Sequence, residues 1–279
     1  MMLSLNQVSK GYGGQIALND ITCILSGGPI ALLGSNGSGK TTLLRLLATL
    51  EKPDGGTIHW NGLDYHQDVT PMRAMIGYLP QTLDLPDHLT PRRLLQYLAL
   101  MRHLPPANAD HLLDQMNLTH LADKRLSALS VGEQRLLGIA QALLGDPELL
   151  LLDEVGTGLD TTKRERIGHL IRRRNRLTIF STHIPAEAER FAEGVIVLGQ
   201  GRLRYAGTVA SLCEYAAGRV YECRIAPDQL PQMSAHHSIS RVMQKDDQLT
   251  VRVVGPRPGP DAVAVAPTLE DAYLLLIQQ

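Results

Sequence analysis

Glycines, serines and one lysine gather in the segment Gly34-Ser-Asn-Gly-Ser-Gly-Lys40-Thr41, and their spacing suits phosphate binding. The segment matches G-x-x-x-x-G-K-[ST] at every fixed position, with an apolar strand pattern before it and a helical pattern after it. The glycines let backbone N–H groups converge on phosphate oxygens, and the helix start adds its positive dipole end. Lys40 is then placed to reach the β- and γ-phosphates, and Thr41 to offer its hydroxyl to Mg²⁺. A glycine-rich turn without a ligand is the weaker interpretation.

The second chemical segment is the apolar run Leu149–Leu152, which ends in Asp153 and Glu154. A strand ending in a carboxylate places Asp153 at the carboxyl edge of a sheet, where nucleotides bind in open α/β folds. There Asp153 would hold Mg²⁺ through water. Glu154 would act as general base for the attacking water, a role worth roughly 10²–10⁴-fold in rate. By itself such a strand end is often structural, but beside the glycine-rich segment the metal interpretation is favoured.

The elements that must position these residues form an α/β unit on a largely parallel sheet, because helical patterns lie between several short apolar runs. A helix is expected over Thr41–Leu50, and the stretch Leu83–His120 indicates a helical insertion between two sheet segments. The expected strands are Leu3–Val8, Ile21–Leu25, Pro29–Leu33, Thr57–Trp60, Met75–Leu79, Leu149–Leu152, Leu177–Ser181 and Val195–Leu198.

The pattern changes after about residue 216. Val220–Ile225 and Thr250–Val254 alternate like exposed strands, Pro256–Pro260 is rich in turn residues, and Thr268–Gln278 is expected to be a helix. We therefore expect a main domain over residues 1–216 and a small α+β accessory domain over residues 217–279.

Further short motifs follow one another along the chain in a fixed order. These are Tyr12 in GYGGQIAL, Gln81 in YLPQ, the segment LSVGE at 129–133, Asp160 in TGLD and His183 in STH. Each is weak alone. With the two segments above, they resemble the ATP-binding subunits of ABC transporters. The resemblance implies a P-loop NTPase domain with a mixed sheet core, an N-terminal antiparallel β part and a helical subdomain at about residues 83–145.

The same resemblance assigns roles to the motif residues. Tyr12 would stack on adenine, and Gln81 would belong both to the catalytic set and to the metal site. Asp160 and His183 would complete the catalytic set with Glu154. The residues expected to contact nucleotide are Tyr12, Gly34, Ser35, Asn36, Gly37, Ser38, Gly39, Lys40, Thr41, Thr42, Ser130, Gly132 and Glu133; those expected at Mg²⁺ are Thr41, Gln81 and Asp153.

The segment LSVGEQ reads first as a capped helix start. The Ser130 side chain can accept a bond from the first free backbone N–H groups, and Glu133 can reach back in a capping box. The resemblance adds that two such subunits pair head to tail, each directing this helix at the ATP held by the other. Both interpretations are compatible, because a helix N-terminus is an anion site.

Three departures from the family pattern stand out. Val131 replaces a glycine, which requires a negative φ at this position. Glu133 replaces a glutamine, and we expect it to face away from ATP as a helix cap and to weaken the ATP sandwich slightly. The segment after Glu154 lacks the usual proline but retains the charged residues, so we expect an active site.

Composition supports this assignment. The 279 residues carry 27 Lys and Arg against 28 Asp and Glu, so no general attraction to nucleic acid is expected. The basic stretch Lys163–Arg176 spreads its charges over several helix faces, as a solvated helix does. Cys23, Cys213 and Cys223 lack metal-ligand spacing and indicate reduced thiols. No signal peptide and no bilayer-length apolar run is recognised, so a cytoplasmic protein is expected. The resemblance implies that it is peripheral on the cytoplasmic face of the membrane.

The sequence therefore predicts an ATPase that uses ATP and Mg²⁺, pairs with a second ATPase subunit and drives a separate integral-membrane permease. The resemblance places the permease contact at about Gln81–Met101. The ending Pro267–Tyr273 resembles ABC-2-type exporters and favours export. Two alternatives stay open: an ABC ATPase acting on nucleic acid or ribosomes, and a low-turnover ATP sensor.

Overall fold

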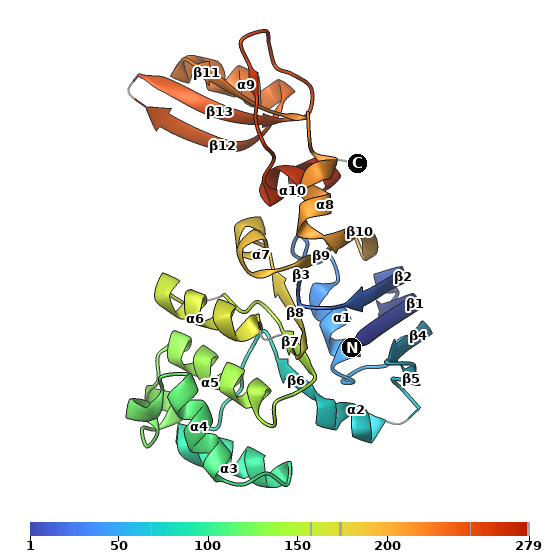
Figure 1. Ribbon diagram of the computed structural model, residues 1–279, viewed down its shortest axis with the longest axis vertical. Coiled ribbons are helices and arrows are strands. Elements are labelled where there is room, and N and C mark those ends of the chain that lie inside the picture. The colour runs from blue at the N-terminus through green and yellow to red at the C-terminus, as the bar shows by residue number, and fades with distance from the viewer. Residues whose placement is uncertain (68, 157, 173–174, 246, 278–279) are drawn as a thin grey trace.

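The computed structural model describes residues 1–67, 69–156, 158–172, 175–245 and 247–277. Figure 1 shows an elongated molecule in which two packed sheets and their helices form the larger part, and a small C-terminal sheet lies at the far end. The α/β fold is confirmed. Among the described residues, none of the helices combines the length and apolar content that a bilayer crossing needs.

The central sheet has the strand order β10-β9-β3-β8-β7-β6, with parallel pairing from β9 to β6 and an antiparallel edge strand β10. Its strands are β3 Pro29–Leu33, β6 Ile76–Leu79, β7 Leu149–Leu152, β8 Leu177–Thr182, β9 Gly194–Gly199 and β10 Arg202–Thr208. The prediction of a largely parallel sheet is therefore confirmed, although sequence patterns missed β10.

Both faces of this sheet are buried, which explains why its strands are continuous apolar runs. Along β7, Leu150 and Leu152 join one apolar cluster, whereas Leu149 and Leu151 join another. Side chains alternate between faces along a strand. One cluster lies beneath the helical insertion, and the other lies between the central sheet, helix α1 (Lys40–Leu47) and the N-terminal sheet.

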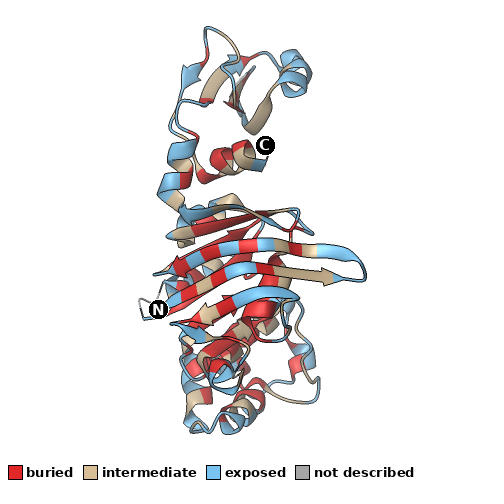
Figure 2. Cartoon of the chain, turned by 90° about the vertical axis from the view of Figure 1, so that its right-hand side faces the viewer, coloured by how far each residue is buried: buried red, intermediate tan, exposed pale blue. Residues whose placement is uncertain are grey.

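The N-terminal sheet is antiparallel, with the order β2-β1-β4-β5. Its strands are β1 Met2–Tyr12, β2 Gln15–Ser26, β4 Gly55–Trp60 and β5 Leu63–Asp64, and the short helix α2 (Val69–Met75) leads from it to β6. Buried and exposed residues alternate along the long strands (Figure 2), because one face packs on the core and the other meets solvent.

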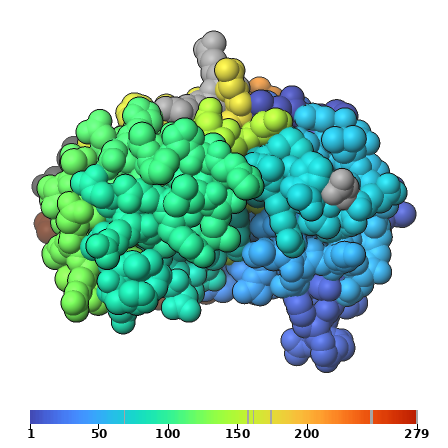
Figure 3. All heavy atoms as spheres, turned by 90° about the horizontal axis from the view of Figure 1, so that it is seen from below, coloured from blue at the N-terminus to red at the C-terminus, as the bar shows by residue number. Residues whose placement is uncertain are grey.

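The helical insertion follows β6 and returns to the sheet at β7. It contains α3 Pro91–Met101, α4 Ala107–Gln115, the turns η1 Thr119–Leu121 and η2 Leu126–Ala128, and α5 Val131–Leu143. From below, it forms a lobe beside the part of the molecule built around α2 (Figure 3). The helical interpretation of Leu83–His120 is confirmed.

Helices α6 (Thr161–Ile171) and α7 (Pro185–Phe191) follow β7 and β8. The expected helix over Lys163–Arg176 is therefore shorter, since α6 ends at Ile171. Two of its charges, Arg173 and Arg174, lie outside the described residues. Helix α1 likewise ends at Leu47, and Thr49 has a φ of 58°, which breaks the helix before Leu50.

The C-terminal sheet has the order β12-β13-β11-β14 and is antiparallel. Its elements are β11 Val220–Ile225, η3 Pro227–Gln229, α9 Leu230–His236, β12 Ser238–Lys245, β13 Gln248–Val254 and β14 Val263–Ala264. It has its own small core, made of Ile225, Leu249, Val251 and Val253. The two strands expected here are confirmed.

The last helix, α10 (Leu269–Ile277), packs on the larger part of the molecule rather than on the small sheet alone. Leu269 and Ala272 of α10 belong to the same apolar cluster as Leu212 of helix α8 (Val209–Tyr215) and Ala216, the residue that follows α8. The division at residues 216/217 thus remains a proposal, with α10 as the element that joins the two parts.

Candidate functional site

The glycine-rich segment forms the turn between β3 and α1. Gly39 precedes the helix with a φ of 102°, and a Cβ there would lie 2.6 Å from the carbonyl oxygen of Ala17. Only glycine adopts this backbone without strain. The first turn of α1 therefore directs its free N–H groups at the space in front of the loop, as a phosphate site requires.

Lys40, the first residue of α1, is 5% exposed and lies under the loop. Its Nζ donates to the carbonyl oxygens of Gly34 at 2.8 Å and Ser35 at 2.9 Å. Burial lowers the pKa of Lys40, while the nearby charges of Glu154 and Asp153 oppose this shift. The ammonium thus contacts the loop carbonyls and is close enough to the two carboxylates to be stabilised by their charge.

An open pocket of about 380 Å³ lies in front of this loop. It is lined by Tyr12, Ala17, Asn36, Gly37, Gly39, Lys40, Thr41, Thr42, Gln81 and Glu154. The fold thus brings together residues from β1, β2, the loop, α1 and the segments after β6 and β7. Gly34, Ser35 and Ser38 belong to the same loop but do not line the pocket.

Asp153 follows β7 and is completely buried. Its Oδ1 accepts a hydrogen bond from Ser181 Oγ at 2.6 Å, and Ser181 Oγ accepts one from the backbone N–H of Glu154 at 2.7 Å. Its other oxygen, Oδ2, is buried and has no hydrogen-bond partner among the described residues. A buried carboxylate oxygen in this state suits the water shell of a hard cation such as Mg²⁺.

Glu154 adopts a left-handed backbone conformation, with a φ of 51°. For a residue with a Cβ this costs of the order of 1–3 kcal/mol and persists only where the surroundings impose it. Here Ser181 binds its N–H, and Arg135 donates to its carbonyl oxygen at 3.0 Å. The conformation directs the Glu154 side chain to the pocket that Lys40 and Gln81 also line.

Tyr12 forms the side of the pocket that is open to solvent. Its side chain is exposed, and its hydroxyl is hydrogen-bonded to the carboxylate of Glu51. Lys10 Nζ lies 5.6 Å from the ring centroid and forms an ion pair of 2.8 Å with Asp54. Burial and Glu51 raise the pKa of Tyr12, so the phenol stays protonated at neutral pH. Glu51 fixes the hydroxyl end of the ring and Lys10 lies over the ring, so the aromatic side chain is held at the mouth of the pocket.

The LSVGE segment lies outside this pocket, at the start of α5. The capping box is confirmed: the Ser130 N–H donates to Glu133 Oε2 at 2.7 Å, and the Glu133 N–H donates to Ser130 Oγ at 3.4 Å. The hydrogen bond from the Ser130 N–H to the Glu133 carboxylate lowers the pKa of Glu133. Val131 is 71% exposed and is absent from the residues with positive φ, as its replacement of glycine requires.

Asp160 and Glu133 line a second open pocket, of about 430 Å³, together with Lys163. Asp160 caps α6 by accepting the N–H of Lys163 at 2.9 Å, which lowers the pKa of Asp160. A Cβ on Gly132 would lie 2.9 Å from the carbonyl oxygen of Gly158, so glycine allows α5 and the segment before Asp160 to approach. His183 follows β8, is exposed and lines neither pocket.

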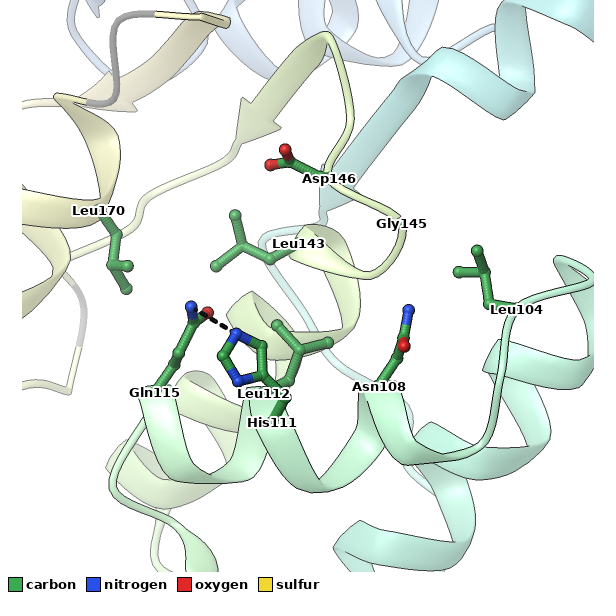
Figure 4. Close-up of a pocket in the computed structure, with 9 residues that line it drawn as sticks. All are labelled: Leu104, Asn108, His111, Leu112, Gln115, Leu143, Gly145, Asp146 and Leu170. Carbon is green, nitrogen blue, oxygen red and sulfur yellow. Dashed lines mark hydrogen bonds between the residues drawn. The ribbon is translucent and has the colours of Figure 1, made fainter.

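A third open pocket, of about 440 Å³, lies between α4, the turn after α5 and α6 (Figure 4). Among its lining side chains, Gln115 Nε2 lies 3.1 Å from His111 Nε2. The motif residues named above do not belong to its described lining, and its side chains offer no phosphate-binding arrangement. The glycine-rich pocket is therefore the candidate site.

Three residues that support the site escaped the sequence analysis: Arg135, Ser181 and Glu51. Arg135 is the one basic residue in helix α5 and is followed by a largely apolar stretch, which is a weak signal of a buried role. Ser181 stood in the STH motif, but only strand pairing between β7 and β8 brings it to Asp153. Glu51 meets Tyr12 across 39 positions, and no sequence pattern indicates that contact.

Comparisons with known proteins agree with this geometry. A family model described as ABC transporter matches residues 18–156. The Nod factor export ATP-binding protein I of Burkholderia orbicola is 32% identical over 98% of this chain and 96% of its own length. The chain belongs to the ABC transporter ATP-binding subunits.

Three further likenesses define how far the family match extends. The sulfate/thiosulfate import ATP-binding protein CysA of Photorhabdus laumondii is 34% identical over 78% of this chain. The match covers 64% of CysA, so the chain spans slightly less than two thirds of that relative's length. A solved ATP-binding subunit of an ABC transporter has a TM-score of 0.68 and 28% identity over 77% of this chain and 93% of its own. The cassette MJ0796, solved as a dimer, has a TM-score of 0.69 at 24% identity, over 74% of this chain and 98% of its own. This chain and MJ0796 share the P-loop NTPase fold.

Proposed function

We propose that this ABC subunit binds MgATP, hydrolyses it and energises transport through a separate membrane-spanning partner. One observation carries the proposal: a single pocket gathers the glycine-rich loop, Lys40, Gln81 and Glu154, with buried Asp153 behind it. Phosphate-binding groups, a metal-suited carboxylate and a candidate base within one site support phosphoanhydride hydrolysis.

In this proposal the loop and Lys40 bind the phosphates, and Tyr12 stacks on the adenine. Thr41, Asp153 through water and Gln81 would hold Mg²⁺, which supplies charge neutralisation at the phosphates. The unpartnered Asp153 Oδ2 supports this donor set. Since Lys40 now donates to Gly34 and Ser35, its ammonium would shift part of its hydrogen bonding toward a phosphate oxygen.

Glu154 is proposed to accept a proton from the attacking water, with Gln81 and His183 orienting water and the γ-phosphate. The strained backbone supports a functional role for Glu154, because non-glycine residues in this conformation cluster at active sites. His183 is exposed, so its proposed contact needs the second subunit or nucleotide to complete the site.

We further propose a head-to-tail dimer around two ATP molecules. Ser130, Gly132, Glu133 and Asp160 lie away from the glycine-rich pocket of their own chain, as contacts with a partner's nucleotide require. The exposed Val131 lies at the same helix start and would be covered in such a dimer. Purification of the ATP-bound dimer would show whether its second subunit is a copy of this chain or a different ATPase.

The permease contact is proposed at Gln81–Met101. There Tyr97, Leu100 and Met101 of α3 are exposed large apolar side chains, each 58–64% accessible. Such a group supports a protein partner. We propose export as the direction, because the match to the Nod factor export protein spans nearly the whole of both chains. The CysA likeness supports import as the second candidate. In either case the chain would lie on the cytoplasmic face of the membrane.

The test is co-purification with a trapped subunit. Glu154→Gln protein is tagged, expressed in its native cell and captured from detergent-solubilised membranes with MgATP, with Lys40→Ala protein as the matched control that should not bind ATP. Recovery of a polytopic membrane protein with Glu154→Gln supports the transporter role. Recovery of ribosomes or nucleic acid instead would favour the alternative ATPase class. Wild-type hydrolysis that Glu154→Gln leaves unchanged would favour a sensor.

A further inference from the structure

Helix α5 carries a buried arginine that contacts the main chain of two site segments. Arg135 is 5% exposed, and its Nη1 donates to the carbonyl oxygens of Pro80 at 2.7 Å and Gln81 at 3.0 Å. Its Nη2 donates to the carbonyl oxygens of Asp153 and, at 3.0 Å, Glu154. Four carbonyls from the segments after β6 and β7 therefore converge on one guanidinium.

This arrangement needs arginine in particular. A buried cation is unfavourable unless strong hydrogen bonds replace its water, and charge-assisted bonds to carbonyls do so. The planar guanidinium presents N–H groups along two fixed directions, so it addresses both segments at once. A lysine ammonium is a point charge with three N–H groups and cannot span the same four acceptors.

The contacts act on backbone whose side chains line the pocket. Gln81 and Glu154 line the candidate site, whereas Arg135 does not. Glu154 is held in its left-handed conformation from both sides, by Ser181 at its N–H and by Arg135 at its carbonyl. Releasing the Arg135 bond would free Glu154 to leave that conformation and so to redirect its carboxylate.

The same helix begins at the LSVGE segment. Ser130 is the N-cap of α5, and Arg135 lies five residues further along the same helix. An α-helix moves as a rigid unit over such a short distance. A shift of the exposed helix start, such as contact with a second subunit would cause, must therefore also shift the four bonds of Arg135.

We infer that Arg135 is a positioning residue that couples helix α5 to the main chain of Glu154 and Gln81. It holds the two segments in the arrangement needed for hydrolysis and transmits movements of the LSVGE segment to them. This inference rests on the proposed function, since it assigns Arg135 a part in ATP hydrolysis without contact to ATP.

The experiment compares Arg135→Lys with wild type in single-turnover hydrolysis of labelled ATP and in equilibrium ATP binding. Hydrolysis should fall roughly 10–100-fold, as for other residues that orient metal-site ligands. ATP affinity should change less than about threefold, because the glycine-rich loop and Tyr12 keep their contacts. Equal losses in affinity and hydrolysis, or unchanged hydrolysis, would overturn the inference.

A matched control separates coupling from stability. Arg176 is 3% exposed and donates to the carbonyl oxygen of Leu170 at 3.0 Å, but it lies before β8, at the sheet edge opposite Asp153. Arg176→Lys should lower the melting temperature and leave single-turnover hydrolysis within about twofold. In the Glu154→Gln background, Arg135→Lys should add little further loss, because coupled sites are non-additive. Full additivity would contradict a role through Glu154.

Two further outcomes are distinguished. Absence of hydrolysis by wild type would overturn the proposed function and this inference together, whereas active wild type with unaffected Arg135→Lys would overturn the inference alone. Should Arg135→Lys and Arg135→Gln both fail to fold, hydrogen–deuterium exchange of wild type decides. ATP should then slow exchange together in residues 80–82, 131–136 and 153–155; slowing in only one of them would contradict coupling.

Discussion

Helices α5 and α10 begin with the same local device in different surroundings. At α5, Ser130 and Glu133 exchange side-chain and backbone hydrogen bonds of 2.7 and 3.4 Å. At α10, Thr268 and Asp271 do the same: the Thr268 N–H donates to Asp271 Oδ2 at 2.8 Å, and the Asp271 N–H donates to Thr268 Oγ1 at 3.3 Å. The four-residue pattern alone does not distinguish them.

The difference lies in what else each carboxylate contacts. Asp271 is fully buried and also accepts bonds from Arg252 of β13 and Ser240 of β12. Arg252 in turn forms an ion pair of 2.9 Å with Glu222 of β11. The α10 cap therefore fastens the small sheet to the main core. The α5 cap leaves its helix start exposed, which suits contact with a partner.

The largest expected effect is on stability at Asp271. Asp271→Ala should lower the free energy of unfolding by about 3 kcal/mol or more, because it leaves the partly buried Arg252 without its main partner. Glu133→Ala should cost only about 1 kcal/mol, as for an exposed cap. Urea unfolding followed by circular dichroism measures both. Equal losses would show that burial does not separate the two caps.

The pH dependence of stability should show the same difference between the buried and the exposed cap. Burial by itself raises the pKa of Asp271, but bonds from Arg252, Ser240 and Thr268 outweigh it, so the pKa is lowered. A carboxyl with a lowered pKa stabilises the fold above its unfolded value, about 3.9, and this contribution is lost as pH falls through the folded pKa. Asp271→Asn should remove part of this acid dependence. Melting temperatures from about pH 7 down to about pH 1.5 cover the range in which this contribution is lost, and unchanged dependence would contradict the prediction.

The hydroxyl caps should differ less. Ser130→Ala should lower the free energy of unfolding by about 1 kcal/mol, and Thr268→Ala by about 1–2 kcal/mol, because Thr268 Oγ1 also donates to buried Asp271. Ser130→Ala should in addition weaken ATP-driven pairing, whereas Thr268→Ala should not. Size-exclusion chromatography in the Glu154→Gln background measures pairing, and equal weakening by both would argue against a special role for α5.

The smallest expected effect concerns Glu133. Glu133→Gln keeps a side chain that can accept from Ser130 and removes a negative charge near the partner's phosphates. ATP-driven pairing should then tighten about two- to fivefold, corresponding to roughly 0.3–1 kcal/mol for one charge near a helix start. Analytical ultracentrifugation with MgATP tests it. An unchanged dimer would show that the carboxylate has no effect on pairing, and a looser one would show that it supports pairing; either result would contradict the prediction.

The sequence was sufficient for the parts of the fold in which local pattern and tertiary role coincide. Leu149–Leu152 and Val220–Ile225 were predicted with their observed bounds, the first from a continuous apolar run and the second from alternating apolar and polar residues. β10 and β12 were missed, because exposed edge strands carry mixed polar residues such as Arg202 and Arg241. The short helices α2 and α9 contain proline and span only seven residues each, so their helical signal is weak.

For the site, the sequence by itself determined the chemical groups and their order along the chain. The glycine spacing predicts a loop before a helix, and the position of Asp153 directly after the apolar run of β7 places its carboxylate at the sheet edge. Only the tertiary structure decided which groups share a pocket: Tyr12, Gln81 and Glu154 meet at the loop, whereas Asp160 and Ser130 lie elsewhere. The hydrogen bonds of Arg135 to four carbonyl oxygens and the ion pair of Asp271 with Arg252 also depend on the tertiary structure. Local patterns encode backbone geometry over a few residues, whereas burial and long-range contacts arise only when distant segments pack.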